Sequence, residues 1–161
     1  MKTTQQLQKR IKTQIGVFIV LLLLSGVTAF PLETELALLV DATQNAPNAL
    51  KNWIAIVYEA VHETNSSYPF MAYGTDWLAF AHIVIATVFI GPFNAPVRNV
   101  WVIQFGMIAC LMVLPLAFIC GAIRHIPLYW QLIDCSFGIL GLIPLYSCYK
   151  NILKLEKLTS N

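Results

Sequence analysis

Two ionisable side chains lie deep inside apolar stretches of the sequence, where an uncompensated charge is expensive. His82 belongs to the stretch 75–92 and Asp134 to the stretch 126–149. Each lies about seven residues, or roughly 10 Å, beyond the start of its expected helix. An ionisable group at such a depth costs about 2.5–3.5 kcal/mol unless it is paired or hydrated. We therefore expect a hydrogen bond between His82 and Asp134 and, around it, a site for a small ligand or an ion.

Helical periodicity places both residues on faces of small and polar side chains. Helix interfaces in membranes favour such side chains, because small ones permit close approach and polar ones find partners there. The two predicted faces consist of Thr75, Ala79, His82 and Ala86 in the stretch 75–92, and of Pro127, Gln131, Asp134, Gly138, Gly141, Leu145 and Cys148 in the stretch 126–149.

Five further polar residues complete the predicted ligand-binding set. They are Asp76, Arg124 and His125 near one mouth of the bundle, Gln131 one turn from Asp134, and Gln104 about 9 Å from the opposite end of its helix. Structural explanations compete with this hypothesis. Asp76 would follow a Thr75 N-cap, where an acidic side chain is favourable to the helix dipole. Arg124 and His125 would lie in a solvated turn, and the His82–Asp134 pair would only fix helix register.

Neither the cysteines nor the histidines have the spacing of a redox or metal site. Cys110, Cys120, Cys135 and Cys148 form no C-x-x-C pair, which predicts four free thiols. A metal site needs three or four convergent ligands, and the sequence has no H-E-x-x-H zinc motif. It also has no P-loop, dinucleotide-binding motif or G-x-S-x-G nucleophile motif. The sequence therefore identifies no metal, no cofactor and no catalytic residue.

The composition places these residues in a membrane protein. Of the 161 residues, 58% are hydrophobic and 11% are charged, against about 45–50% and about 25% in soluble domains. So many apolar residues exclude a disordered chain, and such sparse charge leaves no basic surface for nucleic acid. The lipid bilayer is the partner that this composition predicts.

Four stretches approach the length of about 20 apolar residues that a transmembrane helix needs. They cover residues 15–31, 75–92, 97–123 and 126–149, within one membrane domain over 1–161. The sequence thus predicts an all-α polytopic fold with four transmembrane helices. The first stretch also imitates a signal peptide, because Lys9 and Arg10 precede it and Val27-Thr28-Ala29 resembles a cleavage site. We expect it to be retained as an anchor.

The basic residues predict the orientation of these helices. Lys and Arg accumulate on the cytoplasmic side of a membrane, and with both termini inside only Lys51 and Arg124 are left outside. The other eight are Lys2, Lys9, Arg10, Lys12, Arg98, Lys150, Lys154 and Lys157. This pattern favours a bacterial inner membrane with cytoplasmic N- and C-termini.

The segment 32–73 is then the sizeable part of the chain on the outer face. Within it, residues 49–64 have apolar side chains at helical spacing, and Asn48 is a candidate N-cap. The apolar positions are Leu50, Trp53, Ile54, Val57 and Val61. We expect a short amphipathic helix whose apolar side packs on the protein or on lipid.

Three functional hypotheses follow. The leading one is a small inner-membrane protein whose polar pocket in the outer leaflet, centred on His82 and Asp134, binds a small hydrophobic ligand, an ion or a lipid headgroup. The second is a structural or assembly subunit of a homo- or hetero-oligomeric membrane complex, in which the polar residues only key helices to one another or to a partner. The third is a membrane enzyme acting on a lipid or an isoprenoid.

Overall fold

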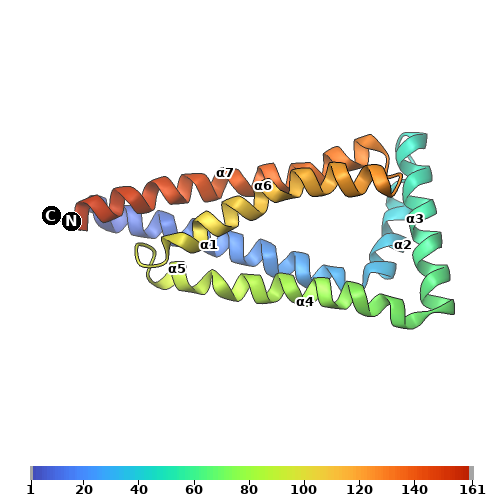
Figure 1. Ribbon diagram of the computed structural model, residues 1–161, viewed down its shortest axis with the longest axis horizontal. Helices are drawn as coiled ribbons and strands as arrows, with labels where there is room; N and C mark the ends of the chain where they lie inside the picture. The colour runs from blue at the N-terminus through green and yellow to red at the C-terminus, as the bar shows by residue number, and fades with distance from the viewer. Residues whose placement is uncertain (1, 160–161) are drawn as a thin grey trace. The chain divides into compact units, whose positions relative to one another are not determined.

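The protein is an all-α polytopic membrane protein, as the sequence predicts. The computed structural model describes residues 2–159. In chain order its elements are α1 (Lys2–Ala29), α2 (Leu32–Ala42), α3 (Asn48–Ser67), the 3-10 helix η1 (Pro69–Met71), α4 (Ala72–Val88), α5 (Ile90–Asn94), α6 (Val100–Ile123) and α7 (Leu128–Thr159) (Figure 1). Within the described residues, the four apolar spans able to cross a membrane are Thr3–Ala29, Pro69–Asn94, Val100–Ile123 and Leu128–Thr159. Such spans place the chain in contact with the lipid bilayer.

The chain divides into two compact units, each built from parts of several helices. Unit 1 contains the chain up to Val20 and from Ala86 onward, and unit 2 contains Leu21–Ile85. The helices α1 and α4 therefore contribute to both units, whereas α5, α6 and α7 belong to unit 1 and α2, α3 and η1 to unit 2. A single membrane domain over 1–161 stays a prediction.

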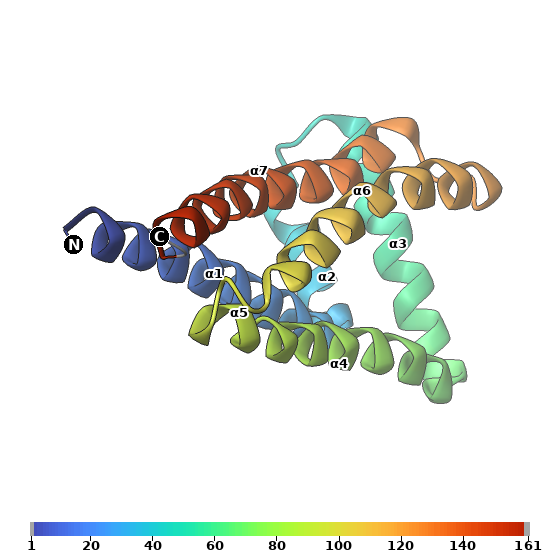
Figure 2. The ribbon, with the colours of Figure 1, turned by 60° about the vertical axis from the view of Figure 1, so that its left-hand side comes forward.

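Close packing of α6 against α7 organises unit 1, where the two helices run side by side as a hairpin (Figures 1 and 2). Gly138 permits this approach, because a Cβ atom there would lie 2.5 Å from the backbone oxygen of Cys110. Small residues serve this purpose in membranes, where helices associate through van der Waals contact rather than through exclusion of water. The fully buried side chains of unit 1 include Ile11, Ile15, Phe89, Ile103, Leu145 and Ile152.

In unit 2 the second half of α1 packs against α4. Gly26 lies at this contact, since a Cβ atom there would be 2.8 Å from the backbone oxygen of Ala79. The helices α2 and α3 pack against each other, and α3 runs crosswise to α4 in both views (Figures 1 and 2). The predicted amphipathic helix is therefore present as α3, and Ile54 of its apolar stripe is buried.

Two N-caps predicted from the sequence, Asn48 and Thr75, are wrong, because in each case the helix begins earlier than expected. The helix α3 begins at Asn48 itself, with Pro47 in the N-cap position and no capping hydrogen bond from a side chain. Thr75 lies inside α4, so Asp76 lies beyond the first turn of that helix. Proline at an N-terminal position favours helix initiation, and Pro69 starts the turn of η1 that leads directly into α4.

Several helix ends also differ from their predicted positions. The sequence does not predict α2, whose 11 residues include two acidic side chains in the first turn. The span expected to start at residue 97 starts at Val100. The side-chain amide of Asn99 donates to the Ala95 carbonyl at 3.0 Å and closes a loop before the helix. The span expected at 75–92 is interrupted between α4 and α5. The last helix continues past residue 149 to Thr159, and the first begins at Lys2.

Candidate functional site

Asp134 lies on the packed face of α7, in agreement with the helical periodicity of the sequence. Gln131, Cys135 and Gly138 on that face are buried, and Asp134 itself is half-buried. It lies six residues after Leu128, or about 9 Å into the helix. Among the described residues, unit 1 provides no hydrogen-bond partner for its carboxylate. A carboxylate in this position requires a counter-charge, water or a proton.

His82 lies on the packed face of α4, where Ala79 is fully buried. Its ring Nδ1–H donates to the backbone oxygen of Leu78 at 2.8 Å, one turn earlier in the same helix. A Cβ atom at Gly26 would lie 3.2 Å from the His82 Cβ atom, which places His82 against α1. His82 belongs to unit 2 and Asp134 to unit 1, so their hydrogen bond stays a prediction.

Gln131 and His125 both stabilise the turn between α6 and α7. The side-chain amide of Gln131 donates to the Ile126 carbonyl at 2.7 Å, and the Gln131 Cδ atom would lie 2.5 Å from a Cβ atom at Gly121. The backbone N–H of Ile126 donates to the Gly121 carbonyl at 2.9 Å, and the backbone N–H of His125 donates to the Ala122 carbonyl at 3.4 Å. These two bonds form a Schellman motif, and His125, with φ of 56°, occupies its left-handed position. The Gln131 side chain and the His125 backbone therefore have structural roles in this turn.

The other predicted site residues are spread over the protein. Arg124 is exposed at the end of α6, close to His125 and Gln131. Gln104 is exposed toward the start of α6, where its amide donates to the Tyr149 hydroxyl at 3.4 Å. It lies about 25 Å along the helix from Gly121, the residue that Gln131 contacts. Asp76 is half-buried on α4 in unit 2. Unit 1 thus gathers part of the predicted set at one end and separates Gln104 from it.

A polar cluster that the sequence does not predict joins α1 to α7 in unit 1. The Gln14 amide donates to the Ser147 hydroxyl at 3.0 Å, and the Asn151 amide donates to the Gln14 side-chain oxygen at 3.1 Å. Asn151 is buried. Ser147 and Asn151 are four residues apart and so share one face of α7, which is the sequence signal that points to this cluster.

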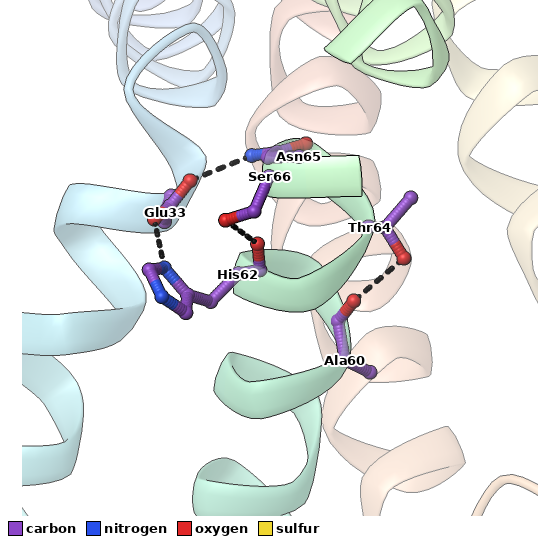
Figure 3. Close-up of polar contacts among 6 residues, drawn as sticks. All are labelled: Glu33, Ala60, His62, Thr64, Asn65 and Ser66. Carbon is purple, nitrogen blue, oxygen red and sulfur yellow. Dashed lines mark hydrogen bonds and ion pairs between the residues drawn. The ribbon is translucent and has the colours of Figure 1, made fainter. Parts of the chain in front are cut away.

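A second unpredicted cluster joins α2 to α3 in unit 2 (Figure 3). The Glu33 carboxylate lies 2.7 Å from His62 Nδ1, and the Asn65 amide donates to its other oxygen at 2.8 Å. The hydrogen bond from His62 lowers the pKa of Glu33. The same hydrogen bond raises the pKa of His62. Glu33 lies in the first turn of α2, two residues after Pro31, which occupies the N-cap position of that helix.

The prediction of four free thiols is confirmed. Within residues 2–159, no three His, Cys, Asp or Glu side chains converge on a position where they could hold a metal ion. No protein family model, curated protein or solved structure matches the chain.

Proposed function

We propose that this protein binds an ion or a small polar ligand within the membrane, at a site centred on Asp134. The observation that carries this proposal is the half-buried Asp134 carboxylate, which has no hydrogen-bond partner among the described residues of unit 1. Ionisable residues inside membrane helices are costly, and they mark ligand and ion sites for that reason. The leading hypothesis from the sequence is thus kept for Asp134, and the part that the sequence assigns to His82 stays a prediction.

The chemistry of the two side chains narrows the class of ligand. His82 uses Nδ1–H for the Leu78 carbonyl, so its neutral ring presents Nε2 as an acceptor. An ionised carboxylate is also an acceptor only. Each of these acceptors needs a proton or a bound cation, which favours a cation, an ammonium group or another hydrogen-bond donor as the ligand.

The proposal includes the orientation of the chain. We place both termini in the cytoplasm and α2 and α3 outside, in a bacterial inner membrane. The support is the charge distribution, because the first turns of α1 and the last turns of α7 are rich in Lys and Arg. Contacts of Gln14 with Ser147 and Asn151 keep these two segments together.

An assembly subunit is the second candidate function, and one observation favours it. Gln14, Ser147 and Asn151 satisfy one another between α1 and α7. Polar groups used in this way fix helix register and need no ligand. If Asp134 has the same purpose, its partner is a donor from another helix or another subunit.

Ligand-dependent thermal unfolding of the purified protein distinguishes the two candidates. The probes are Na⁺, K⁺, Mg²⁺ and ethanolamine, and a ligand at about 100 times its Kd should add about 2.7 kcal/mol of stability. We expect at least one probe to raise the Tm of the wild type, and Asp134→Asn and His82→Ala to abolish that rise. Ser136→Ala is the matched control, because the Ser136 hydroxyl donates only to the Ile133 carbonyl of its own helix, at 2.6 Å.

The contrary results are equally specific. A wild type whose Tm responds to none of the four probes contradicts the binding proposal. Variants that unfold at lower temperature yet keep the full ligand-dependent rise assign Asp134 and His82 to helix packing, and the assembly function then stands. Native mass spectrometry of the same samples reports the number of subunits.

A further inference from the structure

One end of unit 1 carries a concentration of exposed basic side chains, here called the basic end. Its members come from three elements: Lys9, Arg10 and Lys12 of α1, Arg98 of the α5–α6 loop, and Lys150, Lys154 and Lys157 of α7. None of these seven side chains forms an ion pair with another described residue. The positive charge at this end is therefore available to an external partner.

Contacts within unit 1 hold the three elements together at the basic end. Gln14 bonds to Ser147 and Asn151, which keeps α1 beside α7 (Figure 2). The ammonium group of Lys12 lies 5.7 Å from the ring centre of Phe93, which links α1 to α5. The charges thus belong to one packed surface.

The loop that carries Arg98 is also fixed. The side-chain amide of the next residue, Asn99, donates to the carbonyl of Gly91 at 3.2 Å and to the carbonyl of Ala95 at 3.0 Å. These two bonds close the loop between α5 and α6. Arg98 therefore projects from a defined turn.

The basic side chains nearest the spans fall where the sequence predicts the lipid phosphates. The headgroup layers make a bilayer about 40–45 Å thick around an apolar core of about 30 Å, which leaves about 5–8 Å on each side. Lys12 and Lys150 lie at the edges of the apolar parts of α1 and α7, and Lys154 lies about 6 Å beyond Lys150. The Lys150 ammonium group also lies 4.6 Å from the ring centre of Tyr146, one turn back toward the membrane.

From these observations we infer that the basic end is a binding surface for the headgroups of anionic phospholipids. A phosphodiester with a net negative charge complements several ammonium and guanidinium groups at one level, whereas a zwitterionic headgroup brings a competing ammonium group of its own. Basic side chains next to a membrane surface strengthen binding to anionic lipid by about fivefold each. This inference does not depend on the site at Asp134.

Lipid retention by the full chain tests the inference. The protein is placed in nanodiscs of phosphatidylcholine and phosphatidylglycerol in equal amounts, and native mass spectrometry counts the lipids that stay bound after release. We expect phosphatidylglycerol to be retained several-fold over phosphatidylcholine, and Lys12→Gln, Arg98→Gln and Lys150→Gln each to lower that preference by up to about fivefold. Lys51→Gln and Arg124→Gln are the controls, because neither residue belongs to the basic end.

The wild type alone can also decide the question, which matters because loss of basic residues can disturb membrane insertion. Its preference for phosphatidylglycerol should weaken as ionic strength rises, since salt screens exposed charges. Equal retention of the two lipids overturns the inference. A preference that is insensitive to salt, or one that the control variants reduce as much as Lys12→Gln does, also overturns it. The basic residues would then serve to orient the chain in the membrane or to bind an acidic protein partner.

Discussion

Whether a polar side chain within a span finds a hydrogen-bond partner depends on whether it can donate a hydrogen bond. The His82 ring donates to the Leu78 carbonyl, and the Gln131 amide donates to the Ile126 carbonyl. A helix has carbonyl oxygens with a spare lone pair, whereas its N–H groups are already used in the helix. An imidazole or an amide can therefore find a partner in its own helix, but a carboxylate cannot. This asymmetry explains why Asp134 lacks a partner among the described residues of unit 1.

The Glu33–His62 contact predicts a pH-dependent stability for the packing of α2 on α3. The pKa of His62 is raised above 6.5, so its contribution is complete below pH 6.5 and is lost as pH rises through the raised value. The pKa of Glu33 is lowered below 4.5, so its contribution is complete above pH 4.5 and is lost as pH falls through the lowered value. Stabilisation by this contact is thus greatest between pH 4.5 and 6.5.

Amide hydrogen exchange in α2 and α3, corrected for the intrinsic effect of pH, measures this dependence. Protection in the wild type should be highest between pH 4.5 and 6.5, and Glu33→Gln should flatten the profile because it removes the charge. Glu35→Gln changes an acidic residue in the same helical turn and should keep the wild-type profile. If Glu33→Gln keeps that profile as well, the contact does not set the pH dependence.

Periodicity predicts the helix faces well, because close approach in a membrane needs small residues at regular spacing. Gln131, Gly138, Leu145 and Cys148 of α7 are buried as expected. Helix ends are harder to predict. An apolar stretch ends at the membrane surface, whereas the helix continues where its side chains pack against a neighbouring helix. Ile152 and Leu155 are buried in α7 beyond the predicted end at residue 149.

Contacts between distant residues could be anticipated only in part. Asn151 and Glu33 are polar residues near the ends of apolar stretches, where solvent is the default partner, and only the packing of neighbouring helices gives them Gln14 and His62. The local bonds of Gln131 and His125 in the α6–α7 turn depend on backbone geometry. Residue type and depth predict Asp134 as a candidate, because those two properties determine the cost of its charge.

Replacement of Gly138 by Ala tests the packing of α6 on α7. The new Cβ atom would lie 2.5 Å from the backbone oxygen of Cys110 and 3.3 Å from the Val113 Cβ atom. Backbone cannot move aside as a flexible side chain can, so we expect a loss of about 1–3 kcal/mol in the free energy of unfolding. Denaturation of the purified protein in detergent measures this loss.

The matched control is Gly74→Ala in α4, where nothing lies within 4 Å of the added Cβ atom. Alanine is favoured over glycine in a helix by about 0.8–1 kcal/mol, so this variant should be as stable as the wild type or more so. A Gly138→Ala protein that is equally stable would show that the hairpin does not depend on this close approach.

At the scale of the whole molecule, we expect the four candidate spans to return the chain to the side of the membrane on which it began. The helices α2 and α3 lie between the first and second spans in the sequence, so we expect them on the side opposite to both termini. The charges divide in the same way: Glu33, Glu35, Asp41, Glu59 and Glu63 belong to this intervening segment, and most of the Lys and Arg lie near the termini. Span number and charge therefore favour one orientation.

Labelling of single introduced cysteines tests that orientation. Ser66 and Lys154 are both exposed, at the end of α3 and near the end of α7. In intact bacterial cells a membrane-impermeant maleimide should label Ser66→Cys, and it should label Lys154→Cys only after the cells are permeabilised. The unmodified protein controls for reaction of the four native cysteines, all of which lie within α6 and α7. Labelling of both positions from one side contradicts four crossings. Labelling of Lys154→Cys alone keeps the four crossings but reverses the orientation, and the basic end would then face the outer leaflet.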